Sequence, residues 1–126
     1  MGKKIMIVDD SVTLRASVQF FLSNAGFNVV EAVDGKDGIV KLDEAAKSGD
    51  QVAMIISDIN MPNMDGITFI KEIKKTAHKF IPVLVMTTES QEQKKQEGKT
   101  AGAAGWLVKP FQPDQLLSVI KKFITA

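Results

Sequence analysis

The sequence predicts a doubly wound α/β domain, in which a five-stranded parallel sheet carries helices on both faces. Three short segments are apolar at successive positions and not only at alternate ones, namely residues 5–8, 52–56 and 83–86. Continuous apolar runs are typical of strands in a parallel sheet that is covered on both sides. Residues 28–32 and 105–109 are weaker strand candidates. The five candidates alternate with segments of helical periodicity, which is the pattern of this fold class.

The first and last predicted helices show their buried faces through apolar residues spaced three or four positions apart. These residues are Leu14, Val18, Phe21, Leu22 and Ala25 in the first helix, and Leu116, Leu117, Ile120, Phe123 and Ile124 in the last. A third helix presents Ile67, Ile70 and Ile73 on one face. Residues suited to helix ends delimit these segments. They are Gly26 with Phe27, Asp34, Gly49, Asp65, Ser90 with Gln93, and Pro113 with Asp114.

The predicted helix over residues 91–103 differs from the others because it has almost no large apolar side chain. It also contains Gly98, which costs a helix about 1 kcal/mol relative to alanine. We expect a solvated surface helix that contributes little to the core. The alternative is that this helix is loosely held and changes position when the protein switches between two states.

Composition limits the class of protein. The 126 residues are expected to form one domain (1–126), and 44% apolar with 25% charged residues is typical of a soluble globular protein. Sixteen basic and fifteen acidic residues give a net charge of +1, so we expect neither nucleic acid nor a membrane as partner. No membrane span or export segment is recognisable, which predicts a cytoplasmic location. Cysteine is absent, and the single histidine, His78, is expected to be a solvated loop residue without a carboxylate partner.

Polar residues gather where the predicted strands end, and the carboxyl ends of parallel strands meet at one edge of the sheet. They are Asp9 and Asp10 after the first strand, Asp58 and Asn60 after the third, Thr87 and Thr88 after the fourth, and Lys109 after the fifth. Two carboxylates about 4 Å apart repel each other by roughly 4 kcal/mol at an effective dielectric constant of 20, so the cluster needs a cation or a proton. Oxygen donors without His or Cys nearby favour Mg²⁺ over zinc. An aspartate beside such an ion is suited to attack a phosphoryl group, with Lys109 and Thr87 binding the transferred oxygens.

These residues also lie in motifs that resemble the receiver domain of two-component response regulators. The motifs are Asp9-Asp10, Asp58 followed by the segment 60–66 (Asn-Met-Pro-Asn-Met-Asp-Gly), Thr87, and Lys109-Pro110-Phe111. The resemblance runs along essentially the whole chain and is greatest to the stand-alone chemotaxis regulators of the CheY type. It implies a flavodoxin-like (βα)5 fold and a cis peptide bond before Pro110.

Carried over residue by residue, the resemblance implies that Asp58 accepts a phosphoryl group from a sensor histidine kinase. Asp10, Asp58 and the backbone carbonyl of Asn60 would bind Mg²⁺, and Asp9 would contribute through a water molecule. Lys109 would pair with the phosphoryl oxygens.

The resemblance further implies that Thr87 moves toward the phosphoryl group on activation and that Trp106 occupies an aromatic switch position. Tyrosine or phenylalanine is more usual there, and the larger indole has only an N–H donor. Thr88 stands where a small residue is frequent, so its bulk would narrow access to Asp58. Ser11 follows the acidic pair where chemotaxis relatives often have an aromatic residue.

We therefore expect a signalling module and not an enzyme. A magnesium-dependent phosphatase with an aspartyl nucleophile needs a second acid two residues later, where this chain has Asn60. A flavin-binding domain needs a Ser, Thr or Gly phosphate loop after the first strand, where this chain has two aspartates, and no nucleotide-binding P-loop is recognisable. The expected partners are a sensor histidine kinase, a flagellar switch or other downstream protein, and a phosphatase, with the chain itself a monomer. Chemotaxis is the first interpretation, and a single-domain receiver in another phosphorelay, or a phosphate sink, is the alternative.

Overall fold

Five parallel strands form one sheet in the order β2-β1-β3-β4-β5, which is the flavodoxin-like topology that the resemblance implies. The structure, a computed structural model, describes residues 3–88 and 91–124. The strands are β1 (Lys4–Val8), β2 (Asn28–Ala32), β3 (Val52–Ser57), β4 (Val83–Thr87) and β5 (Gly105–Val108). All five predicted strands are confirmed, because each forms at its expected place in the chain.

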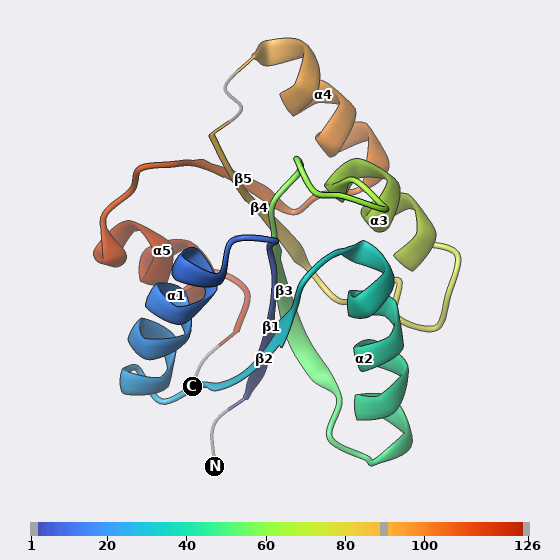
Figure 1. The fold of residues 1–126 in the computed structure, drawn as a ribbon, viewed down its shortest axis with the longest axis vertical. Coiled ribbons are helices and arrows are strands. Elements are labelled where there is room, and N and C mark those ends of the chain that lie inside the picture. Colours follow the sequence, from blue (N-terminus) through green and yellow to red (C-terminus); the bar gives the residue numbers. More distant parts are fainter. Residues whose placement is uncertain (1–2, 89–90, 125–126) are drawn as a thin grey trace.

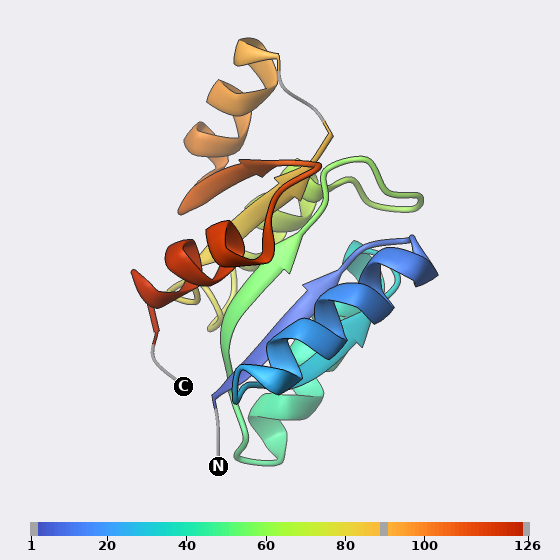
Figure 2. The same ribbon diagram turned by 90° about the vertical axis from the view of Figure 1, so that its left-hand side faces the viewer.

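Helices cover both faces of the sheet, as predicted (Figure 1). The helices are α1 (Val12–Asn24), α2 (Gly35–Lys47), α3 (Gly66–Ile73), α4 (Glu92–Ala101) and α5 (Pro113–Lys121). Helices α1 and α5 lie on one face and α2 and α3 on the other, where α4 follows α3 toward the β5 edge (Figure 2). Within the described ranges, no helix is both long and apolar enough to cross a membrane.

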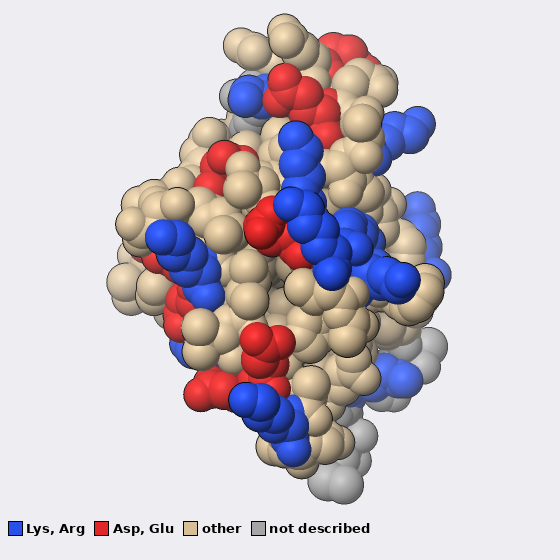
Figure 3. Space-filling model, turned by 90° about the vertical axis from the view of Figure 1, so that its right-hand side faces the viewer, with Lys and Arg blue, Asp and Glu red and all other residues tan. Residues whose placement is uncertain are grey.

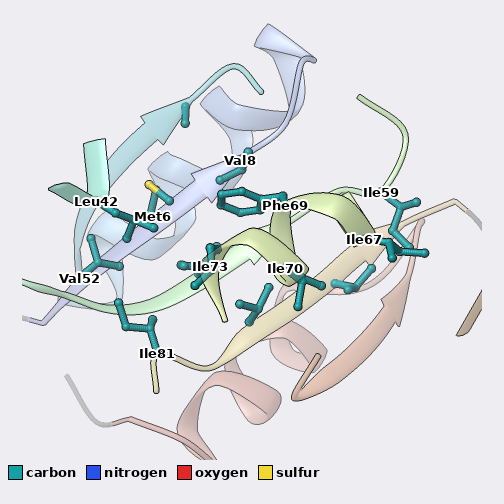
Figure 4. Packing of buried hydrophobic residues seen from close by; sticks show 14 of the residues in the cluster. Met6, Val8, Leu42, Val52, Ile59, Ile67, Phe69, Ile70, Ile73 and Ile81 are labelled. Carbon is teal, nitrogen blue, oxygen red and sulfur yellow. The ribbon is translucent and has the colours of Figure 1, made fainter. Parts of the chain in front are cut away.

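Each face of the sheet has its own apolar core. Under α2 and α3, the ring of Phe69 is fully buried and lies close to Val8 of β1 (Figure 4). The predicted apolar face of α3 is confirmed, because Ile67, Ile70 and Ile73 are all buried in this core. On the opposite face, buried residues of α1 and α5 pack on β1, β3 and β4. They are Val18, Leu22, Leu116 and Ile120.

Side chains at the helix ends form the predicted caps. The Asp34 carboxylate accepts the N–H of Asp37 at 2.9 Å, and the Asp65 carboxylate accepts the N–H of Thr68 at 2.9 Å. Gly26 follows α1 with φ of +98°, a conformation that costs glycine little. The predicted capping residue Ser90 lies outside the described residues. The sequence therefore positions α1, α2 and α3 by local hydrogen bonding as well as by burial.

The polar helix α4 is shorter than predicted. It spans Glu92–Ala101 and not residues 91–103, because Gly102 turns the chain out of the helix with φ of +112°. Within Glu92–Ala101, Gly98 alone is buried, which confirms that α4 contributes little to the core. The prediction for Phe123 is wrong. Helix α5 ends at Lys121, and the ring of Phe123 is 41% exposed.

The prediction for His78 is also wrong. Its side chain is buried, and Nε2 lies 2.8 Å from Oδ1 of Asp43 on α2. The two residues are 35 positions apart, so local spacing could not reveal this pair. The contact joins the segment before β4 to the outer side of α2, at a distance from the strand-end residues.

We expect Phe69→Ala to lower the free energy of unfolding by about 3–5 kcal/mol, because the ring is fully buried. Phe80→Ala is the matched control, since that ring is 86% exposed and Nζ of Lys79 lies over it, 5.3 Å from the centroid. Its loss should be below about 1 kcal/mol. Urea denaturation followed by circular dichroism compares the two variants, and equal losses would contradict this assignment of the core.

Candidate functional site

Three carboxylates meet at the carboxyl-terminal edge of the sheet. Asp9 and Asp10 follow β1, Asp58 follows β3, and β1 and β3 are neighbours in the sheet. One carboxylate oxygen from each residue lies within 4.8 Å of the other two. Asp9 and Asp58 are buried, whereas Asp10 is exposed. The strand-end argument correctly predicts that these three side chains come together.

Lys109 bridges the two buried carboxylates. Its Nζ donates to Oδ2 of Asp9 and to Oδ2 of Asp58, each over 3.1 Å. The backbone N–H of Lys109 donates to the carbonyl of Thr87 at 2.7 Å, and the following peptide bond, to Pro110, is cis as predicted. The end of β5 thus brings one ammonium group to the acidic cluster.

The turn that follows Asp58 holds the second oxygen of its carboxylate. Oδ1 accepts the N–H of Ile59 at 2.6 Å and, over a longer 3.4 Å, the N–H of Asn60. Gly66 packs so closely against this turn that a Cβ atom there would lie 2.1 Å from the carbonyl oxygen of Asp58. A glycine is therefore required at the start of α3. The Asp58 carboxylate is oriented through both of its oxygens.

Burial raises the pKa of Asp9 above its ordinary value, because the interior disfavours the charged form. The N–H of Ser11, which donates to Oδ1 of Asp9 at 2.8 Å, and the ammonium of Lys109 both act against this increase. The neighbouring carboxylate of Asp58 adds to it. Negative charge on Asp9 would therefore be stabilised by further positive charge at the site.

The donor set of this cluster fits Mg²⁺. Its three ligand atoms are all carboxylate oxygens, which are the donors that Mg²⁺ prefers. Mg²⁺ usually keeps several waters and needs only one or two protein carboxylates, so the exposed position of Asp10 suits an ion that faces solvent. The cluster is an acidic pocket of the kind that binds this ion.

The two predicted switch residues lie on the neighbouring strands β4 and β5. Thr87 is fully buried at the end of β4, and Thr88 beside it is exposed. Trp106 is half-buried, and its indole lies directly against α4. A Cβ atom at Gly98 would stand 2.8 Å from Cζ3 of Trp106, which explains the glycine in the middle of this helix. The sequence shows that Gly98 is unfavourable for the helix but not that it makes room for a tryptophan.

The loop between β3 and α3 is fastened to the start of α2, a contact that the sequence did not predict. Nδ2 of Asn63 donates to Oδ2 of Asp34 at 2.7 Å, and Asn63 has φ of +68°. A Cβ atom at Gly35 would lie 2.9 Å from Sδ of Met64, so the loop and α2 are in close contact. The only signal in the sequence was the capping role of Asp34. This contact fixes the loop that also carries Asn60.

Comparison with known proteins identifies the family. The model of the response regulator receiver domain matches residues 5–121. Protein PilG of Pseudomonas aeruginosa is 32% identical over 124 residues, which cover 98% of this chain and 88% of PilG. Chemotaxis protein CheV3 of Helicobacter pylori is 35% identical over 127 residues, which cover 96% of this chain and 40% of CheV3. The structure of chemotaxis protein CheY4 of Vibrio cholerae matches with a TM-score of 0.90 and 42% identity, covering 98% of this chain and 100% of that one.

The chain therefore belongs to the response regulator receiver family. Its members are signalling domains and not catalytic enzymes, which confirms the expected class. The share of each relative that is matched varies widely. The chain spans 88% of PilG but only 49% of the regulatory protein VanRc of Enterococcus gallinarum.

Asp34→Ala removes the acceptor for both Asp37 and Asn63, and we expect it to lower the free energy of unfolding at pH 7 by about 1–2 kcal/mol. The N–H of Asp37, followed by the side chain of Asn63, lowers the pKa of Asp34. The stabilisation is therefore complete above the unfolded-state pKa of about 3.9 and is lost as the pH falls through the lower native pKa. Urea denaturation from pH 7 to pH 2 measures this loss. A difference between wild type and variant that stays constant over that range would contradict it.

Proposed function

We propose that the protein is a phosphorylation-dependent switch of a two-component system, in which Asp58 accepts a phosphoryl group from a sensor histidine kinase. The observation that carries this proposal is the environment of the Asp58 carboxylate. It lies 3.1 Å from Nζ of Lys109 and within 4.8 Å of the carboxylates of Asp9 and Asp10. A nucleophilic oxygen, a fixed ammonium group and an acidic metal pocket are the components that phosphoryl transfer to a carboxylate needs.

In the proposed reaction, a carboxylate oxygen of Asp58 attacks the phosphorus of a phosphohistidine. A P–O bond forms, the P–N bond breaks, and its electron pair returns to the imidazole nitrogen. Lys109 carries the positive charge that pairs with the transferred oxygens. Mg²⁺ held by Asp10, Asp58 and the Asn60 carbonyl, with Asp9 acting through water, would neutralise charge that develops on the phosphoryl oxygens.

The new charge on Asp58 would act on β4 and β5. The acyl phosphate carries about 1.5–2 negative charges in place of the single charge of the carboxylate, and it can create one to three charge-assisted hydrogen bonds. At about 1.5–3 kcal/mol each, three such bonds give about 4.5–9 kcal/mol, a range that includes the ~5.5 kcal/mol that turns a 1:99 equilibrium into 99:1. We propose that the Thr87 hydroxyl supplies one of them and that Trp106 then changes its packing against Gly98. Helix α4 would transmit the change to a protein partner.

Chemotaxis is the pathway that we propose, because CheY4 and CheV3 are chemotaxis proteins by name. A flagellar switch component is then the downstream partner, and a phosphatase would reset the system. Figure 3 supports a protein partner over nucleic acid on the face of α2, α3 and α4, since lysines gathered there have acidic side chains directly against them. Lys75 pairs with Glu72 and Lys94 with Glu97 on this part of the surface. VanRc is a regulatory protein by name and not a chemotaxis protein, so a receiver of another phosphorelay, or a phosphate sink, remains the second candidate.

The proposal predicts that a small phosphodonor with Mg²⁺ adds one phosphoryl group, and that Asp58→Asn abolishes this labelling. The modification should be sensitive to base and hydroxylamine, as an acyl phosphate is, and chelating the metal should prevent it. Intact-protein mass spectrometry measures the stoichiometry. Asp114→Asn, an exposed aspartate in the first turn of α5, is the matched control and should label as wild type does. Labelling of Asp58→Asn at the wild-type rate would refute the proposed acceptor.

The single tryptophan reports whether phosphorylation is transmitted. We expect the emission of Trp106 to change with Mg²⁺ and phosphodonor, or with a beryllium fluoride mimic, and to change less with Mg²⁺ alone. Gly98→Ala should alter the spectrum before phosphorylation, because a methyl group would stand 2.8 Å from the indole. Thr87→Ala should still be labelled but should show a weakened emission change.

Thr100→Ala, an exposed substitution on the same helix, is the matched control for the variant at Gly98. A spectrum that does not change at full phosphorylation of the wild type would exclude Trp106 as the switch. That result would favour the phosphate sink, which needs the acceptor but no transmission to a partner.

A further inference from the structure

Arg15 is a cation close to the acidic site for which neither the strand-end argument nor the motifs provide a role. It is the only charged residue of α1, and its side chain is only 11% exposed, so it turns inward from the helix. A guanidinium group that is withdrawn from water to this extent needs strong hydrogen-bond partners. Those partners show what the residue does.

The Arg15 side chain connects the end of β1 to β2. Nη1 donates to the backbone carbonyl of Asp9 at 2.6 Å, and Nε donates to Oε1 of Glu31 at 3.2 Å. Glu31 is itself tied to α2, because Nζ of Lys41 donates to its carbonyl. Asp9 has a second backbone contact with the same strand, because its N–H donates to the carbonyl of Ala32 at 3.1 Å. The backbone of Asp9 is therefore held at both its N–H and its carbonyl.

This anchoring matters most for Asp10. The carboxylates of Asp9 and Asp58 are each held by the ammonium of Lys109 and by backbone N–H groups. The carboxylate of Asp10, by contrast, is exposed and accepts no hydrogen bond from any residue in 3–88 or 91–124. With no such hydrogen bond from the described residues, its position depends on the backbone that carries it. The peptide between Asp9 and Asp10 contains the carbonyl that Arg15 binds.

We propose that Arg15 is a positioning residue for the metal site: by fixing the Asp9–Asp10 peptide, it places the Asp10 carboxylate beside those of Asp9 and Asp58. This inference rests on the proposed function, in which the acidic cluster binds a divalent cation. Glu31 acts through Arg15, because it orients the guanidinium toward the Asp9 carbonyl.

A purely electrostatic role for Arg15 predicts the opposite effect of its removal on metal affinity. Arg15 is a cation near the site, so its removal would lessen repulsion and tighten the binding of a second cation. Positioning predicts that binding weakens, since loss of an outer partner of a metal site typically costs about 10- to 100-fold in affinity. The sign of the change therefore separates the two roles.

Mn²⁺ is the probe, and electron paramagnetic resonance of the free ion measures its dissociation constant for the whole chain. We expect Arg15→Ala to weaken Mn²⁺ binding about tenfold. Arg15→Lys should recover part of the loss, because an ammonium group can still donate to one carbonyl. Glu31→Ala should weaken binding to a smaller extent. The double variant should bind no more weakly than Arg15→Ala, since Glu31 acts through the arginine.

Lys4→Ala is the matched control. Lys4 is another partly buried cation with a carboxylate partner, Asp50, but it lies at the opposite end of β1 from Asp9. Its removal should leave the Mn²⁺ affinity unchanged. Urea denaturation without metal shows whether each variant is folded, and Arg15→Lys with Glu31→Ala provide the test if Arg15→Ala does not fold.

Equal or tighter Mn²⁺ binding by folded Arg15→Ala would overturn the positioning role and leave the proposed function intact. So would independent, additive effects of Arg15→Ala and Glu31→Ala. A wild-type protein that binds no Mn²⁺ would refute the metal site of the proposed function and, with it, this inference.

Discussion

The attraction of one ammonium group for two buried carboxylates is the interaction on which this site depends. Unscreened by a cation, carboxylates as close as those of Asp9 and Asp58 repel each other by several kcal/mol at the dielectric constants typical of proteins. Lys109 offsets this repulsion with two contacts of 3.1 Å. To make them it must reach past the end of β4, because the sheet order places β4 between β3 and β5. The backbone hydrogen bond from Lys109 to Thr87 fixes the chain at this point, so the residue that binds both carboxylates also contacts a predicted switch residue.

Most of the fold follows from the order of apolar and polar residues. Runs that are apolar on both faces mark the strands, and because the strands are parallel, residues far apart in sequence arrive at one edge. Asp10, Asp58 and Lys109 could therefore be predicted as neighbours without a structure. Their identities as oxygen donors and a cation then restrict the chemistry. The bounds of α4 were predicted less well, because a helix without an apolar face offers no periodicity from which to find its ends.

The contacts that escaped prediction all involve polar or small residues, whether their partners are near or distant in sequence. His78 pairs with Asp43, Asn63 donates to Asp34, and Arg15 binds the Asp9 carbonyl. Hydrogen bonds between side chains, or from a side chain to a carbonyl, leave no repeating pattern in a sequence. The role of Gly98 could not be predicted from the sequence either, because it depends on where the side chain of Trp106 lies. These contacts fix the orientation of elements whose existence the apolar pattern already determines.

The sparse burial of α4 means that the molecule is not equally stable throughout. Only Gly98 is buried within Glu92–Ala101, so little apolar surface of this helix becomes exposed to solvent when the helix detaches. The amide protons of α4 should therefore exchange with water through local opening, whereas those of the central strands exchange only when the whole domain unfolds. The receiver thus combines a rigid sheet, which keeps the acidic site in register, with one helix of low local stability. In the proposed function, a partner that binds α4 would have only to order a short segment, and the free energy of that ordering would be small enough for a single covalent modification to control.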